Sequence, residues 1–507
     1  MKARKLTCRH DPSLARMTFS VLSHLFGLLY PEWKGRQSRE STVLRKSVKT
    51  TSVMGYILSI LRKCFRRGAL RNAKGNRGLD LGFLVADGQV TRTHVSLPQA
   101  RRAEHIAIVG KTGTGKSSLL RSLCAQDIAA RRGFVYFDLH GDATPFLLRT
   151  VAREEQRSGE DLSERLILVE PGDPECSVGL NILEQRSSTF VQIAEFVEVL
   201  KERWHLASLG ARSEELLRNV LYTLRESGYT LIELVPFLVK PDFRALCLAQ
   251  LSNADVKQYF EARFNELSEA MQAVVREPIL NKTSAFTADP HFRHILGQPK
   301  STFSVTDVIE QGRWLILNLD RGRLGEEAVT LGSLFLSMIK HTLFSRHNRQ
   351  LFTLYCDEIQ NLVVGESSLE TILSESRKFG VSVTSANQFL DQFPPRMRSA
   401  ILAVGTHVFF QLSSGDAQHI SAALDGGKSL AELLKNLPHR QMVVKSGAEH
   451  WQEVRQGRLE HPTASYANLL TRCRARWARQ RNDIEEEIVR RHELLMHSSN
   501  EILHGWD

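Results

Sequence analysis

GKTGTGKS, at residues 110–117, is the most informative stretch in this chain, because it matches G-x-x-x-x-G-K-[ST] at every fixed position. Its three glycines allow the backbone to wrap closely around phosphate oxygens, since no Cβ stands in the way. An apolar run from His105 to Val109 precedes the stretch, and a helix is expected from about Lys116 to Arg131. The order of strand, glycine turn and helix is the context in which this pattern binds phosphate.

The loop also predicts its ligands. Backbone N–H groups and the N-terminus of the following helix present positive potential to an anion. Lys116 is expected to bridge the β- and γ-phosphates of ATP, and the Ser117 hydroxyl to bind Mg²⁺. The predicted nucleotide-binding residues are Gly110, Lys111, Thr112, Gly113, Thr114, Gly115, Lys116, Ser117 and Ser118.

A second motif lies far along the chain, where the apolar run Phe352–Cys356 ends in Asp357 and Glu358. Acidic side chains at the carboxyl end of a parallel strand lie where open α/β sheets bind ligands. We expect Asp357 to bind the metal, and Glu358 to orient and activate the attacking water. The alternative, two acids that cap a helix, is weakened by the phosphate loop in the same chain. The two motifs are therefore predicted to meet around one triphosphate.

Two polar side chains follow the acidic pair. Arg377 ends a helical stretch, where it can stabilise transition-state charge at a neighbouring subunit's nucleotide or balance the helix dipole. Composition alone favours the dipole. Gln388 follows the apolar run Val381–Ser385 and can sense the γ-phosphate or be an ordinary loop amide.

Asp138 and His140 end another apolar run, Phe134–Leu139, and their roles stay open. They could contact the second shell of the metal. A metal-dependent nuclease is disfavoured, because two acids and one histidine are too few ligands.

Apolar runs typical of buried strands lie on both sides of a long helical region, which predicts an α/β fold. Strands that alternate with helices imply a mainly parallel, twisted sheet covered on both faces. A hairpin is expected over 82–97 around Asp87-Gly88, and Ser213 is expected to cap a helix. The predicted parts are a basic N-terminal arm with short helices (1–78), the first part of a P-loop nucleotide domain (79–186), an all-α insertion (187–300), the second part of the nucleotide domain (301–465) and a C-terminal charged helix (466–507).

The net charge of +11 is unevenly distributed. Residues 1–104 contain 21 Lys and Arg against 6 Asp and Glu, whereas the rest of the chain contains 46 against 50. Such an arm suits nucleic acid or an anionic membrane surface, with a solvated tail as an equal alternative. Its apolar runs, Phe19–Tyr30 and Val53–Leu61, are too short to span a bilayer. Seven cysteines without a CxxC pair fit a reducing cytosol.

Together the motifs resemble the FtsK–HerA superfamily of DNA pumps, and within it the coupling proteins of type IV secretion systems, which are conjugative DNA transfer ATPases. The resemblance spans roughly residues 80–460, and the joint spacing of its motifs is more specific than any one of them. It is carried by GKTGTGKS (110–117), YFDLHGD (136–142), NKTSAF (281–286), ILNLDRGRLGEE (316–327), YCDEIQN (355–361), SESRKFGVSVTSANQF (374–389) and GTHVFFQLSSGDA (405–417).

The resemblance implies a RecA-like nucleotide domain with an all-α domain, assembled as a homohexameric ring around DNA. It implies ATP-driven movement of DNA, with a relaxase and type IV secretion components as partners. It makes Arg377 a trans-acting arginine finger and Gln388 a sensor, beside a hydrolytic set of Lys116, Ser117, Asp357 and Glu358. Coupling proteins usually carry N-terminal transmembrane helices, which this sequence does not have. We therefore expect a cytoplasmic protein that meets the inner face of the cell membrane peripherally or through a partner.

Other functions stay open at this point. One is a secretion ATPase that moves protein, and another is a soluble HerA-like repair helicase. A nucleotide-regulated scaffold with negligible turnover is disfavoured, because a pure switch needs neither Glu358 nor Arg377. Arg396 and Arg398 are either DNA contacts in a pore or surface charges.

Overall fold

The structure, a computed structural model, describes residues 78–503 except 185–188, 204–209 and 364–365. The predicted basic arm, with its two short apolar runs, lies outside the described residues. All described residues belong to one compact unit, Leu70–Asp507. In the described ranges, no helix combines the length and the apolar character that crossing a membrane requires.

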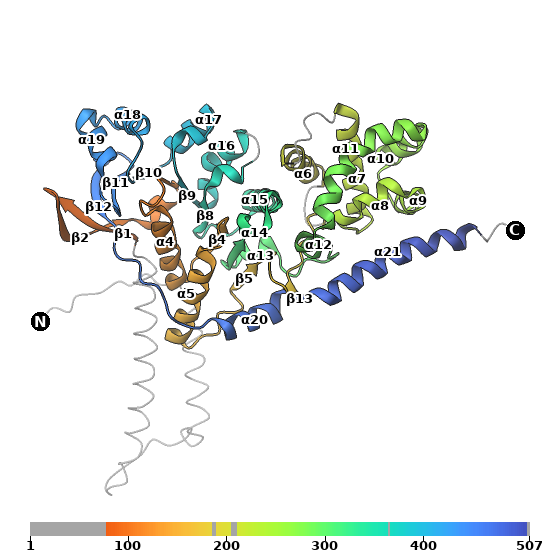
Figure 1. Ribbon diagram of the computed structural model, residues 1–507, viewed down its shortest axis with the longest axis horizontal. Coiled ribbons are helices and arrows are strands. Elements are labelled where there is room, and N and C mark those ends of the chain that lie inside the picture. Colours follow the sequence, from red (N-terminus) through yellow and green to blue (C-terminus); the bar gives the residue numbers. More distant parts are fainter. Residues whose placement is uncertain (1–77, 185–188, 204–209, 364–365, 504–507) are drawn as a thin grey trace, which may run out of the picture. The chain divides into compact units, whose positions relative to one another are not determined.

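An eleven-stranded sheet forms the centre of this unit (Figure 1). Its strands are β1 (Leu79–Ala86), β2 (Gln89–Leu97), β3 (Ile106–Val109), β4 (Gly133–Asp138), β5 (Leu166–Val169), β7 (Trp314–Asn318), β8 (Phe352–Asp357), β9 (Val381–Asn387), β10 (Thr406–Phe409), β11 (Gln441–Ser446) and β12 (Gln452–Arg455). Parallel strands run in the order β10-β3-β9-β8-β4-β7-β5, and β11, β12, β1 and β2 extend the β10 edge in antiparallel pairs. The predicted fold class, a mainly parallel α/β sheet, is confirmed.

The predicted hairpin is also confirmed, since β1 pairs with β2 across Asp87-Gly88. Both turn residues have positive φ, 49° and 71°, which matches the right-handed twist of the flanking strands. The strand predicted at Val408–Leu412 forms two residues earlier, as β10. Its pairing with β3, in which Thr406 lies opposite Ile106, sets the start of the strand.

Both faces of the sheet are buried, because successive side chains of a strand point to opposite sides. In β4, Val135 and Phe137 pack into one core, while Phe134 and Tyr136 pack into the other. The second core is completed by α4 (Lys116–Ala130) and α5 (Ala143–Ser158), and the first by α15 (Glu326–Ser345).

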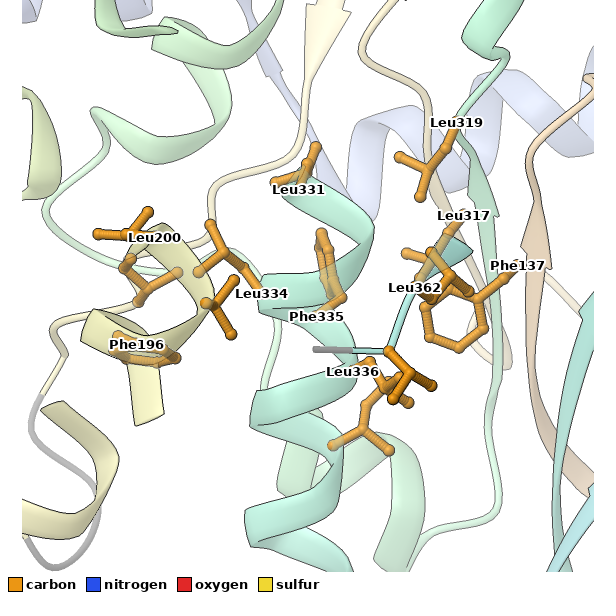
Figure 2. Close-up of a cluster of buried hydrophobic side chains, with 14 of the residues drawn as sticks. Phe137, Phe196, Leu200, Leu317, Leu319, Leu331, Leu334, Phe335, Leu336 and Leu362 are labelled. Atoms are coloured by element: carbon orange, nitrogen blue, oxygen red, sulfur yellow. The ribbon is translucent and has the colours of Figure 1, made fainter. Parts of the chain in front are cut away.

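Helix α15 lies between the sheet and the helical insertion (Figure 2). Leu334 faces Phe196 and Leu200 of α6 (Thr189–Arg203), and Phe335 lies in the same cluster as Leu317 of β7. All of these side chains are buried. Burying a leucine or phenylalanine contributes about 1.5–3 kcal/mol, so this shared core fixes the insertion to the sheet.

The insertion is helical, as predicted, and continues with α7 (Gly210–Glu226), α8 (Leu234–Val239), α9 (Pro241–Ala249), α10 (Ala254–Tyr259), α11 (Glu269–Ala288) and α12 (Pro290–Leu296). The prediction that Ser213 caps a helix is wrong. Ser213 lies inside α7, and its hydroxyl donates a hydrogen bond of 2.9 Å to the Val275 carbonyl of α11. The hydroxyl is therefore satisfied by a neighbouring helix, because α7 begins a turn earlier than its polar residues suggest.

The C-terminal segment, expected as one charged helix, forms two. These are α20 (Ala467–Trp477) and α21 (Arg481–Leu503), and between them β13 (Arg479–Gln480) pairs with β6 (Cys176–Ser177). The segment is not peripheral. Trp477 of α20 donates to the Ser163 carbonyl at 3.1 Å, and Arg491 of α21 forms a 2.8 Å ion pair with the fully buried Glu233.

Candidate nucleotide-binding site

The glycine loop connects the buried strand β3 to helix α4 at the carboxyl edge of the sheet. The Gly110 N–H donates to the Asn387 carbonyl at 3.1 Å, which fixes the loop to the end of β9. Gly113 and Gly115 have φ of 78° and 123°, in the region that residues with a side chain rarely adopt. Both glycines are thus required by the loop's conformation.

Lys116 opens α4 and is only 6% exposed. Its ammonium group donates to the Lys111 carbonyl at 3.0 Å, across the loop. Burial lowers the pKa of Lys116, and the negative charges of Glu358 and Asp357 act in the opposite direction. The ammonium and both carboxylates therefore lie within electrostatic reach of one another.

Ser117 and Asp357 are in direct contact. The Ser117 hydroxyl donates to Asp357 Oδ2 at 2.8 Å, between the first turn of α4 and the last residue of β8. Burial raises the pKa of Asp357, the hydrogen bond from Ser117 opposes this, and the nearby charge of Glu358 adds to it. The phosphate loop and the acidic strand thus meet, as the sequence predicted.

Glu358 turns away from β8 with a left-handed backbone, at φ 60° and ψ 57°. Its N–H still donates to the Ala386 carbonyl of β9 at 2.8 Å. A non-glycine residue in this region costs on the order of 1 kcal/mol or more, and such strain concentrates at functional sites. The turn lets Glu358 leave the strand beside Asp357 without breaking the link to β9.

Sequence reasoning gave no role to Gln360 and Asn387, although both lie inside quoted motifs. The Gln360 amide donates to Glu358 Oε2 and accepts from the Asn387 side-chain amide. Asn387 is fully buried at the end of β9. A detectable signal was the amide side chain two positions after the acidic pair, but only the folded chain pairs it with Asn387.

Gln388 lies beside the phosphate loop, where its Oε1 accepts a 3.2 Å hydrogen bond from the Thr112 hydroxyl. Arg377 lies at the other edge of the sheet, in a 3-10 turn before β9, and forms a 2.9 Å ion pair with Glu104. A strand rises about 3.3 Å per residue, so β9 separates Arg377 from its own phosphate loop by about 20 Å. Within one chain, Gln388 joins the loop and Arg377 does not.

Arg396 and Arg398 lie on α17 (Pro395–Leu402). Arg398 forms a 3.0 Å ion pair with Asp391. Arg396 lines the same hollow as Arg377, near the amino ends of β3 and β10. The two arginines therefore have different surroundings, and of the two only Arg396 lines the hollow that Arg377 lines.

Asp138 ends strand β4, and its carboxylate lies at the N-terminus of helix α5. Its two carboxylate oxygens accept from the backbone N–H groups of Gly141, Ala143 and Thr144, and Oδ2 also accepts from the Thr144 hydroxyl. These bonds satisfy donors that a helix N-terminus leaves free. His140 is exposed beside the site, and its charge acts to lower the pKa of Asp357.

A buried network joins α4 to β8 beneath the loop. Arg102 and Asp127 form a fully buried ion pair of 2.6 Å, and the Tyr355 hydroxyl donates to Asp127 at 2.7 Å. Since Asp127 lies on α4 and Tyr355 on β8, the network holds the helix of Lys116 and Ser117 against the strand of Asp357. Losing one partner of such a pair leaves an uncompensated buried charge, which is costly.

The sheet order, the glycine loop on β3 and the acidic end of β8 define a P-loop ATPase fold of the RecA-like, FtsK–HerA type. A family model for the type IV secretion-system coupling protein DNA-binding domain matches residues 89–458. The chain belongs to this family. No curated protein matches the chain.

Solved structures share the fold. The bacterial conjugative coupling protein TrwBΔN70 is 18% identical, covering 78% of this chain and 93% of its own, with a TM-score of 0.50. TrwB in complex with ADP and Mg²⁺ is 19% identical, covering 77% and 96%, with a TM-score of 0.51. VirB4 of Thermoanaerobacter pseudethanolicus is 15% identical, covering 75% and 97%, with a TM-score of 0.51.

Proposed function

We propose that this chain is an ATP-dependent DNA translocase that moves DNA in conjugative transfer and works as a homohexamer. The observation that carries the proposal is the contact between Ser117 and Asp357, in a chain of the coupling-protein family. That contact joins the two halves of a hydrolytic site.

The residues of the site fit ATP with Mg²⁺. The positive-φ glycines, Gly113 and Gly115, leave space for phosphate oxygens, and the start of α4 faces them with positive potential. Ser117 and Asp357 offer the adjacent hydroxyl and carboxylate oxygens that Mg²⁺ prefers. Bound there, Mg²⁺ would neutralise charge on the β- and γ-phosphates. TrwB has been solved with ADP and Mg²⁺ and with a non-hydrolysable ATP analogue, which supports the same ligands here.

Each side chain then has a defined task in hydrolysis. Lys116 exchanges the Lys111 carbonyl for phosphate oxygens and balances their charge. Glu358 accepts a hydrogen bond from the attacking water and takes its proton. Gln388 touches Thr112 of the loop, so it can report whether the γ-phosphate is present.

Arg377 acts in trans. It lies about 20 Å along β9 from its own phosphate loop, farther than its side chain reaches. Its side chain is 63% exposed, so it can contact another subunit while it is paired with Glu104. An arginine supplied by a neighbour stabilises charge at the transferred phosphoryl group, which makes hydrolysis depend on ring assembly.

DNA is the proposed cargo, and a relaxase and the secretion channel are the proposed partners. The ring would grip DNA phosphates through loops facing its pore, with little sequence preference and a strong dependence on salt. We place the protein in the cytoplasm at the inner face of the cell membrane. Fractionation of cells with and without the secretion channel checks this location.

The decisive experiment measures ATP hydrolysis by the full chain with no DNA, single-stranded DNA and double-stranded DNA, alongside native mass. The proposal expects stimulation by at least one form of DNA and a mass of six chains under the stimulating condition. Turnover that DNA leaves unchanged but a secreted protein raises would instead identify a motor for protein.

A further inference from the structure

A hollow of about 690 Å³ lies at the amino ends of the parallel strands, away from the phosphate loop. Side chains of α16 (Glu366–Glu375) and α17 line it, together with the residues before β3 and β10. Arg377 and Glu104 both line this hollow and form a 2.9 Å ion pair with each other. Arg377 has a proposed role in hydrolysis, whereas Glu104 does not.

Glu104 is held more firmly than its partner. Its side chain is 24% exposed, against 63% for Arg377. The Glu104 carbonyl accepts a 2.6 Å hydrogen bond from the Gly405 N–H. A Cβ at Gly405 would overlap the Glu104 side chain, so glycine is needed there for the carboxylate to lie where it does. Glu104 therefore gives the more exposed arginine a partner whose position is fixed.

The next residue, His105, holds the backbone that carries Arg377. It is buried with φ of 67°, and its Nδ1 accepts from the Val383 N–H of β9 at 3.0 Å. Its Nε2 donates to the Leu373 carbonyl of α16 at 2.8 Å. Arg377 lies between Leu373 and Val383 in sequence. Glu104 therefore pairs with the side chain of Arg377, while His105 hydrogen-bonds to the backbone before and after Arg377.

Stability does not explain the ion pair, because a pair with so exposed a member contributes little to it. The ion pair instead fixes the orientation of the guanidinium group. Glu104 contacts it at one terminal nitrogen, Nη2, which leaves the exposed part of the group available to phosphate oxygens. Holding a long side chain in its working orientation beforehand removes an ordering cost from the reaction itself.

We propose that Glu104 is a positioning residue for Arg377, which it holds ready for the ATP of the neighbouring subunit. The inference rests on the proposed function, in which Arg377 acts in trans. Glu104 touches no substrate and acts only through the guanidinium. Glu104 lies just before β3, and β3 leads into the chain's own phosphate loop. The same strand therefore connects the subunit's own ATP site with the residue that positions Arg377 for the neighbour's ATP.

A double-mutant cycle on the full chain tests this, with DNA-stimulated ATP turnover as the readout. Glu104→Gln removes the charge and keeps the shape. We expect kcat to fall about 10-fold, because misplacing a group in the site is costly, with KM for ATP within about twofold. The kcat of Arg377→Ala should be lower still. The kcat of the double variant should equal that of Arg377→Ala, because two changes that act through the same group are not additive. Glu449→Gln is the matched control, since Glu449 pairs at 3.0 Å with nearby Arg101 instead.

The outcomes separate the two proposals. If Glu104→Gln has the wild-type kcat and Arg377→Ala has a low kcat, Glu104 does not position Arg377, and the arginine-finger role of Arg377 is still supported. Additive losses in the double variant also overturn the positioning role, because Glu104 would then act without Arg377. Wild-type kcat in Arg377→Ala overturns the trans mechanism and this inference with it. If Glu104→Gln loses its cooperative melting transition, Glu104→Asp carries the test, with an intermediate kcat expected and an unchanged kcat contradicting it.

Discussion

The Ser117 hydroxyl donates a 2.8 Å hydrogen bond to Asp357, although 240 positions separate the two residues in sequence. Ser117 lies in the first turn of the helix that follows β3 and the glycine loop. Asp357 is the last residue of β8, which is separated from β3 in the sheet by β9. The contact brings together the two oxygen ligands expected for Mg²⁺, one from each motif.

Replacing either partner should therefore raise the Mg²⁺ requirement. In Ser117→Ala and Asp357→Asn we expect the Mg²⁺ concentration for half-maximal ATP turnover to rise about 10-fold or more, because each removes one ligand. A Mg²⁺ titration of phosphate release measures this, with Asp161→Asn at a distant surface ion pair as the control. An unchanged midpoint in both variants would remove these residues from the metal site.

Replacing Gln360 should lower the rate of ATP hydrolysis more than it weakens ATP binding. It joins the carboxylate of Glu358 to the amide of Asn387, so its loss would free Glu358 to swing. For Gln360→Ala we expect kcat about 10- to 100-fold lower, as for other misplaced groups, and little change in the Kd of a fluorescent ATP analogue. If kcat stays at the wild-type value, Glu358 does not need this amide.

Subunit mixing tests whether Arg377 acts across an interface. Lys116→Ala and Arg377→Ala should each be nearly inactive, since an arginine finger contributes about 10³-fold or more. In mixed rings some interfaces join an intact phosphate loop to an intact Arg377, so activity should return well above either variant alone. Two Arg377→Ala preparations mixed together serve as the control. No recovery, in rings that native mass proves to be mixed, would assign Arg377 a role within its own chain.

His105 gives the fold a pH dependence. Burial lowers its pKa to about 4 from the ordinary 6.5, while a carbonyl hydrogen bond raises it and the charge of Arg377 lowers it further. The folded state then binds fewer protons than the unfolded state between those values, so stability is complete above pH 6.5 and is lost as pH falls toward 4. Between pH 7 and pH 5 the wild type should lose about 2 kcal/mol more than His105→Gln in urea unfolding. Equal losses would mean that His105 is protonated in the fold.

Local patterns explain what could be predicted. The loop at 110–117 is one continuous stretch of sequence, and so is the acidic end of Phe352–Cys356. Each follows an apolar run that is visible in the sequence. The strands, the hairpin and the helical insertion follow from the same periodicities.

Features that depend on distant partners could not be predicted. Ser213 looked like a cap, but its hydroxyl bonds to Val275 on another helix. Asp138 looked like a possible contact to the second shell of the metal, but in the structure its oxygens accept hydrogen bonds from the backbone at and just before the start of α5. The pairing of Arg377 with Glu104 joins residues far apart in sequence, and no local pattern marks it.

If the phosphate loop and the two acids form one hydrolytic site, Lys116→Ala should abolish ATP turnover. Phosphate release should be measured with saturating ATP and DNA, beside the wild type and a Lys257→Ala control from the exposed surface of the insertion. We expect phosphate release to fall at least about 100-fold with an unchanged melting temperature, because the ammonium group that stabilises charge on the phosphates is gone. Phosphate release by Lys116→Ala at the wild-type rate would contradict this expectation.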